Sequence, residues 1–98
     1  MSQVVPTGQE LLDERALSKL RWRCRRGLLE NDLFIARFFD RYGATLNSRQ
    51  AQALGVLMDL SDNDLLDLFL ARKSLGQVEV GLDSTDLREI LKMVRETR

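Results

Sequence analysis

The fold is organised around residues 22–32, which read Trp22-Arg23-Cys24-Arg25-Arg26-Gly27-Leu28-Leu29-Glu30-Asn31-Asp32. In this stretch a basic amphipathic segment runs into a single glycine, and a strongly apolar segment starts directly behind it. Glycine can adopt a positive φ without a Cβ clash, so Gly27 suits a helix C-cap or a tight turn. The pattern predicts two helices that meet at Gly27.

Upstream of Gly27, apolar residues recur at intervals of three and four, which is the period of an amphipathic helix. Thr7 and Glu10 have the spacing of a capping box, which predicts that the first helix starts near Thr7 and includes Leu11 and Leu12. We expect residues 1–8 to form a flexible N-terminal tail and residues 9–98 to form a single helical domain.

Downstream of Gly27, a second helix is expected from about Leu28 or Leu29 to Tyr42. Its apolar residues cover more than one stripe, so the sequence predicts a helix that is buried on more than one side and forms the centre of the core. A glycine, Gly43, is expected to end it.

Three further helices are expected, and their predicted N-caps are Asn47, Ser61 and either Asp83 or Ser84. Residues 73–81 are interpreted as an extended linker, because the short alternating pattern there has no second strand to pair with. The sequence therefore predicts a small, all-α domain of five helices with a buried second helix.

The composition limits the function. The 98 residues contain 15 Lys and Arg, 15 Asp and Glu, one cysteine and no histidine. Without histidine the chain lacks the commonest general base and the usual zinc ligands, so we expect neither an enzyme nor a metal site. No apolar run approaches the roughly 20 residues that span a bilayer, and no secretory signal is evident, so we expect a cytoplasmic protein without membrane insertion.

The basic residues between positions 15 and 26 lie close to Trp22, an arrangement that nucleic-acid-binding proteins also use. The chain as a whole is neutral, and no further run of Lys or Arg extends a phosphate-binding footprint. We therefore expect no nucleic-acid partner.

Residues around Gly27 are the candidates for binding a partner. Arg25 and Arg26 supply forked donors for carboxylate or phosphate, and Glu30 could orient Arg26 across one helical turn. A purely structural interpretation stays open, in which Gly27 is a cap and Arg26 pairs with Glu30 at the surface. Trp22 has two open interpretations, an exposed anchor for a partner or the lid of a small core.

Cys24 lies on the apolar stripe of the first helix. The neighbouring arginines could make it reactive, but a small buried hydrophobic residue is the favoured interpretation. A single cysteine cannot form an internal disulfide, which fits a reducing cytosol.

These residues carry a resemblance to a known family. The pattern Trp22-x-Cys24-Arg25-Arg26-Gly27-x-x-Glu30-x-Asp32, followed by Phe38, Tyr42 and Leu46, resembles the small succinate dehydrogenase assembly factors, also called flavinylation factors or FAD assembly factors. The pair Leu57-Met58 and the segment Asp62-x-Asp64-Leu65 continue the match. The resemblance covers about residues 20–70 and agrees with the five-helix fold of that family.

The resemblance implies a dedicated chaperone rather than an enzyme. Members of the family bind the flavoprotein subunit of succinate dehydrogenase, and in some bacteria that of fumarate reductase, and promote covalent attachment of FAD to it. The factor itself is expected to hold no FAD stably and to act as a monomer. An alternative of another class is a regulatory protein-interaction module of antitoxin type. By motif matching, the partner-binding residues are Trp22, Arg25, Arg26, Gly27, Glu30 and Asp32.

Overall fold

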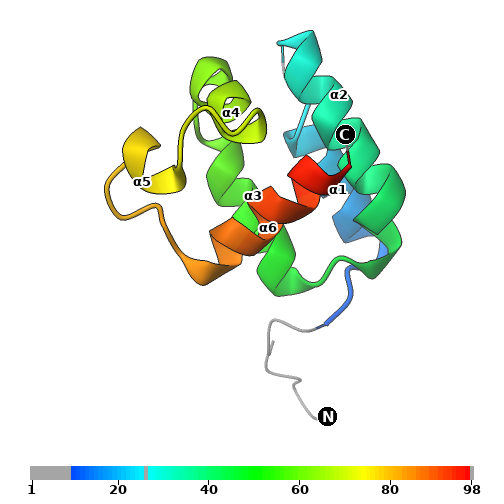
Figure 1. Ribbon diagram of the computed structural model, residues 1–98. Coiled ribbons are helices and arrows are strands. Elements are labelled where there is room, and N and C mark those ends of the chain that lie inside the picture. The colour runs from blue at the N-terminus through cyan, green and yellow to red at the C-terminus, as the bar shows by residue number, and fades with distance from the viewer. Residues whose placement is uncertain (1–9, 26, 98) are drawn as a thin grey trace.

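A computed structural model describes residues 10–25 and 27–97, and within them the chain forms six α-helices and one short 3₁₀ helix (Figure 1). The elements are α1 (Glu14–Arg23), α2 (Leu29–Tyr42), η1 (Gly43–Thr45), α3 (Ser48–Met58), α4 (Asp62–Phe69), α5 (Leu75–Val78) and α6 (Thr85–Glu96). Helix α2 packs against α4 and α6, α3 packs against α6, and α1 packs against α3. The predicted all-α fold is confirmed, with one helix more than expected.

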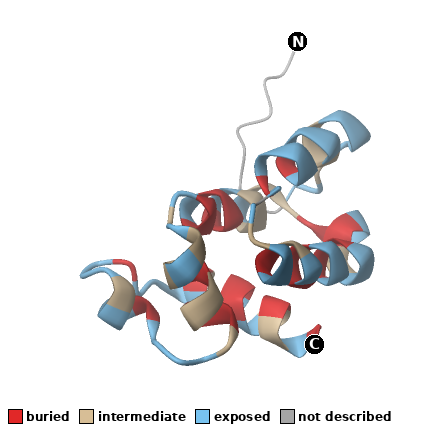
Figure 2. Cartoon of the chain, turned by 90° about the horizontal axis from the view of Figure 1, so that it is seen from above, coloured by how far each residue is buried: buried red, intermediate tan, exposed pale blue. Residues whose placement is uncertain are grey.

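Helix α2 supplies the centre of the core, as predicted. Phe38 is fully buried, and its ring centroid lies 5.5 Å from that of Phe39 and 5.6 Å from that of Tyr42. Phe34 contacts Phe69 of α4, with the ring centroids 5.3 Å apart. Buried residues lie on the inward faces of the helices, whereas residues on the outward faces are exposed (Figure 2).

The prediction that α2 is buried on more than one side is wrong. Leu29 and Leu33 expose 67% and 47% of their surface. Helices α4 and α6 pack on the side of α2 that carries Phe34 and Phe38, and the leucines lie on the opposite side of the helix. An apolar strip of α2 is therefore open to solvent.

Helix α1 starts later than predicted. It begins at Glu14, and the Asp13 side chain caps it by accepting a hydrogen bond from the Ala16 N–H at 2.7 Å. Leu11 and Leu12 precede the helix, because their segment forms an antiparallel bridge with the start of α3. Two backbone hydrogen bonds hold this bridge, from Leu12 N–H to the Leu46 carbonyl at 3.0 Å and from Ser48 N–H to the Glu10 carbonyl at 2.9 Å. The expected cap at Thr7 and the expected tail, residues 1–8, lie outside the described residues.

The later caps follow the prediction. Asn47 and Gln50 form a capping box, in which each backbone N–H donates to the other residue's side chain, at 2.8 and 3.0 Å. Ser61 caps α4, and Ser84 rather than Asp83 caps α6. Gly43 ends α2, but in a right-handed conformation that leads into η1.

The interpretation of residues 73–81 as an extended linker is wrong. They contain α5, a single turn whose Leu75 is buried against the core. The Ser74 N–H donates to Gln77 Oε1 at 2.8 Å. Ser74 and Gln77 are three residues apart, like Asn47 and Gln50 in the capping box of α3. No helix of the described residues combines the length and the apolar character that a membrane crossing requires.

The end of α4 contains a backbone conformation that is unfavourable for its residue. Ala71 has a φ of +59°, in the left-handed region where a Cβ is strained. The N–H of Arg72 donates to the Asp67 carbonyl at 2.8 Å, and that of Ala71 donates to the Leu68 carbonyl at 3.1 Å. This is the Schellman pattern, whose left-handed position glycine normally occupies.

Replacing Ala71 by glycine is therefore expected to stabilise the protein by about 1 kcal/mol, because the left-handed strain disappears. The midpoint of thermal unfolding, followed by circular dichroism, should rise by roughly 4–8 °C. Ala36, exposed in the middle of α2, is a matched control: Ala36→Gly should lower stability by about 1 kcal/mol. A lower midpoint for Ala71→Gly would contradict the left-handed geometry.

Candidate functional site

The end of α1 brings the predicted site to the surface. The helix ends at Arg23, and Cys24 is its C-cap, with its N–H donating to the Leu20 carbonyl at 3.0 Å. Cys24 is fully buried in the core, so its interpretation as a small buried hydrophobic residue is confirmed.

Trp22 is an exposed side chain. It exposes 69% of its surface, which excludes its role as the lid of the core. The guanidinium of Arg25 lies over the indole, 5.1 Å from the ring centroid, in a cation–π contact. The two side chains therefore stand together on the surface where α1 ends.

Of the two roles expected for Gly27, a C-cap of α1 or a turn, the first is wrong, because the helix ends four residues earlier, at Arg23. Gly27 is exposed, and a Cβ at this position would meet no atom within 4 Å. It lies in the bend that leads into α2. Arg26 lies outside the described residues, so its predicted pairing with Glu30 stays a prediction.

The first turn of α2 carries the two predicted carboxylates. The N-cap is Leu28, whose side chain cannot accept a hydrogen bond from the helix amides. Glu30 is exposed and Asp32 is half-buried, and both lie in the first turn, where a negative charge is favoured by the helix dipole. Glu30 is therefore presented to solvent beside Gly27.

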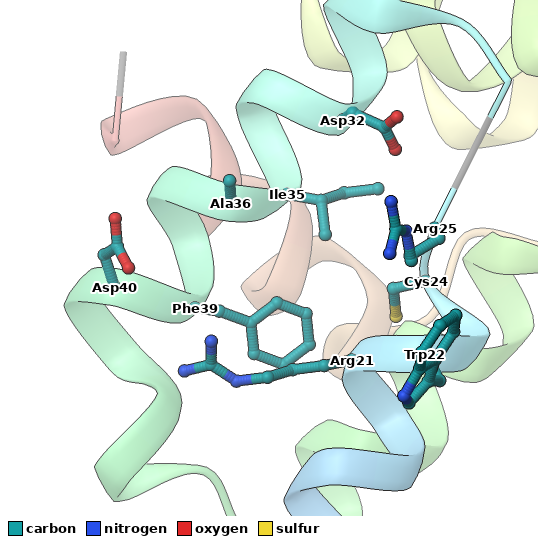
Figure 3. A pocket seen from close by; sticks show the side chains of 9 residues that line it. All are labelled: Arg21, Trp22, Cys24, Arg25, Asp32, Ile35, Ala36, Phe39 and Asp40. Atoms are coloured by element: carbon teal, nitrogen blue, oxygen red, sulfur yellow. The ribbon is translucent and has the colours of Figure 1, made fainter.

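A groove of about 470 Å³ lies between α1 and α2 (Figure 3). Helix α2 contributes Asp32, Ile35, Ala36, Phe39 and Asp40 to its lining, and the end of α1 contributes Arg21, Trp22, Cys24 and Arg25. Three of the predicted site residues, Trp22, Arg25 and Asp32, meet in this groove. Gly27 and Glu30 do not line it.

Several groove residues were not predicted from the sequence. Arg21 precedes Arg25 by one turn, and Asp40 follows Asp32 by two turns with Ala36 between them. Residues four apart lie on the same face of a helix, so this spacing contained the signal. Arg21 also lies over the ring of Phe39, 5.1 Å from its centroid.

The exposed apolar residues of α2 adjoin the groove. At 100° per residue, Leu29, Leu33 and Ala36 fall on one face of α2, the face that also carries Asp32 and Asp40. Leu29, Leu33 and Trp22 are all exposed, so the two helices present accessible apolar side chains as well as charged groups. Protein-binding surfaces have this composition.

A buried polar residue, Asn31, connects the start of α2 to α4. Asn31 is fully buried, and its Nδ2 donates to the Asp62 carbonyl at 2.9 Å and lies 3.4 Å from Asp62 Oδ1. Its own Oδ1 has no hydrogen-bond partner among the described residues. Asn31 thus ties the first turn of α2 to the first turn of α4. Asn31 was not predicted as a buried residue from the sequence. Its position three residues before Phe34 places both side chains on the same face of α2, which was the available signal.

Comparison with known proteins identifies the family. The family described as "Flavinator of succinate dehydrogenase" matches residues 18–98. A protein of Ralstonia nicotianae named FAD assembly factor SdhE is 47% identical over 83 residues, covering 85% of this chain and 84% of the relative. Proteins of the same name from Coxiella burnetii and Pseudomonas aeruginosa are 28% and 29% identical and cover 83% and 86% of this chain, and 90% and 92% of their own. No solved structure matches. The chain, which carries the exposed Trp22 and Glu30 on either side of Gly27, therefore belongs to the family of succinate dehydrogenase flavinators, the FAD assembly factors.

Proposed function

We propose that this protein is a non-catalytic assembly chaperone that acts in the cytoplasm. It binds the flavoprotein subunit of succinate dehydrogenase, or that of fumarate reductase, and promotes the covalent attachment of FAD to that subunit. Membership of the flavinator family supports this function over an antitoxin-type module. The observation that carries the proposal is the surface at the junction of α1 and α2, where Trp22 and Glu30 are exposed next to an unobstructed glycine, Gly27.

The proposed docking surface consists of the motif residues and their neighbours. Glu30 and Gly27 are accessible to a partner backbone, and the stacked pair of Trp22 and Arg25 offers an aromatic face beside a fixed cation. Tryptophan and arginine are the residues most often found at the energetic centres of interfaces. The full set is Trp22, Arg25, Arg26, Gly27, Glu30 and Asp32.

FAD is proposed to be held by the partner and not by this chain. The groove is lined by Asp32 and Asp40 as well as by Arg21 and Arg25, so the described lining offers the pyrophosphate of FAD no excess of positive charge. This balance of charge supports the proposal that the chain holds no resident flavin nucleotide. FAD is instead the cargo of the reaction, bound in the flavoprotein subunit.

The contribution of the chaperone is proposed to be positional. The chain has no histidine, and Arg25 and Glu30 of its docking surface are exposed to solvent. Holding the flavoprotein subunit in a competent arrangement can lower the barrier to bond formation without supplying an acid or a base. A monomer is sufficient for this role.

Deleting the gene is expected to reduce covalent flavin on the succinate dehydrogenase flavoprotein subunit strongly, as measured by in-gel flavin fluorescence. Restoring the wild-type gene should restore the signal. Glu30→Ala should restore it poorly, because the loss of a central interface residue weakens docking by roughly tenfold or more.

Glu14→Ala provides a matched control for Glu30→Ala. Glu14 is also an exposed first-turn carboxylate, in α1 rather than α2, so both substitutions remove a similar helix-dipole interaction. Glu14→Ala should complement fully. Unchanged covalent flavin after gene deletion would overturn the function, and equal complementation by both variants would overturn the role of Glu30.

A further inference from the structure

The groove between α1 and α2 has an apolar floor. Ile35 and Phe39 expose 5% and 4% of their surface, and Cys24, which also lines the groove, is fully buried. Ala36 is an exposed lining residue between the two carboxylates of α2, and its small side chain occupies little of the groove. A volume of about 470 Å³ lies within the usual range of sites that enclose a bulky group, about 300–1,000 Å³.

Two arginines of the groove are held in place by aromatic rings. Arg21 lies over Phe39, and Arg25 lies over Trp22, each with its guanidinium carbon 5.1 Å from the ring centroid. A glycine makes room for the first of them, because a Cβ on Gly43 would stand 3.1 Å from Arg21 Nη2. Neither Arg21 nor Arg25 forms an ion pair within the part of the chain that the structure describes. Both guanidiniums are thus ordered and retain donors for an incoming carboxylate.

The opposite wall carries carboxylates. Asp32 and Asp40 stand eight residues apart on α2, about 12 Å along the helix, with Ala36 midway between them (Figure 3). Asp40 has no ion-pair partner in residues 10–25 and 27–97. Two cations and two carboxylates balance, so the groove favours neither a polyanion nor a polycation.

We propose that this groove receives an amphipathic segment of the flavoprotein subunit, which seats one bulky apolar side chain above Ala36 and carries both an acidic and a basic residue beside it. The acidic residue meets Arg21 or Arg25, and the basic residue meets Asp40. The exposed leucines of α2 extend the apolar contact beyond the groove. This inference rests on the proposed function and names the chemistry that the partner must present.

Cross-linking from the groove tests the occupant directly. In Ala36→Cys the introduced thiol is accessible, whereas the native Cys24 is fully buried, so a thiol-specific heterobifunctional photo-cross-linker attaches at one site. Incubated with the purified flavoprotein subunit, this variant should give a cross-linked flavoprotein peptide with a bulky apolar residue and charges of both signs within a few positions. Gln52→Cys on the exposed face of α3 is the control and should give no such peptide. A peptide with one sign of charge, or a cross-link to a second copy of this chain, would overturn the proposal.

Filling the groove separates this proposal from the proposed function. Ala36→Trp should weaken binding to the flavoprotein subunit by about tenfold or more, while Gln52→Trp binds like the wild type. Circular dichroism checks that both variants are folded, and Ala36→Leu replaces Ala36→Trp if the larger side chain disturbs α2. Wild-type affinity in the folded groove-filled variant would overturn the groove as the binding site and leave the proposed function intact. A wild-type protein that does not bind the subunit at all would overturn both.

Discussion

Replacing Phe38 by alanine is expected to lower the free energy of unfolding by about 3–5 kcal/mol. Phe38 has no exposed surface, and its ring contacts those of Phe39 and Tyr42 within α2, the helix that packs against both α4 and α6. The truncation therefore leaves a cavity inside the core, which cannot collapse unless the packed helices move. Since small domains have a total stability of about 5–15 kcal/mol, the loss is a large fraction of it.

Urea unfolding followed by circular dichroism measures this effect, and the thermal midpoint should fall by roughly 12 °C or more. Leu33→Ala is the control, because it removes an apolar side chain from the same helix at a position that is 47% exposed. It should change stability by less than about 0.5 kcal/mol. A similar loss for both variants would contradict the difference in burial between the two faces of α2, and a larger loss for Leu33→Ala would mean that the two faces have been exchanged.

The elements that the sequence predicts well are those with a complete local signal. Helix α6 has an N-cap serine and four apolar residues on one face, and all four, Leu87, Ile90, Leu91 and Val94, are buried. Helix α3 starts at the predicted capping box of Asn47 and Gln50. In both cases the cap and the period fall within one short window, so no distant contact is needed to define the helix.

The errors at the start of α1 and in residues 73–81 have a non-local origin. The start of α1 was predicted too early because Leu11 and Leu12 fit the helical period, but a bridge to residues 46–48 holds their backbone in an extended conformation. The turn α5 is stabilised by burial of Leu75 against the core. Neither the bridge partner nor the covering core is visible in the local pattern.

The site was only partly predictable for a related reason. Trp22, Arg25 and Asp32 were singled out from the motif, and the structure brings them to one groove. Arg21 and Asp40 lie outside the motif, and they join it because α1 and α2 face each other across the groove. That approach depends on how both helices pack on the rest of the core, which spacing along one helix does not specify.

Asn31 shows how the docking surface is linked to the core. Its Nδ2 donates to the carbonyl of Asp62 at 2.9 Å and lies 3.4 Å from the Asp62 carboxylate, while its Oδ1 is buried without a partner among the described residues. The side chain thereby fixes Glu30 and Asp32, its neighbours in the chain, relative to α4. A charge at this position should cost stability, because the side chain has no surface exposed to solvent.

Asn31→Asp is expected to destabilise the protein by about 3–5 kcal/mol at neutral pH, because it buries an uncompensated carboxylate against the carbonyl and carboxylate of Asp62. Burial and the like charge raise the pKa of the new carboxyl above its unfolded value of about 3.9. The loss of unfolding free energy is therefore complete at pH values above the pKa of the carboxyl in the folded protein. It disappears as the pH falls toward the pKa of the carboxyl in the unfolded chain. Urea unfolding at pH 7 and near pH 4 should show that the difference in unfolding free energy between wild type and variant becomes smaller in acid.

Two variants serve as controls. Asn63→Asp, an exposed first-turn change in α4, should show no such difference, and Asn31→Leu should lose less stability than Asn31→Asp. If the difference in unfolding free energy between wild type and Asn31→Asp stays constant with pH, the loss of stability comes from the shape of the new side chain and not from its charge.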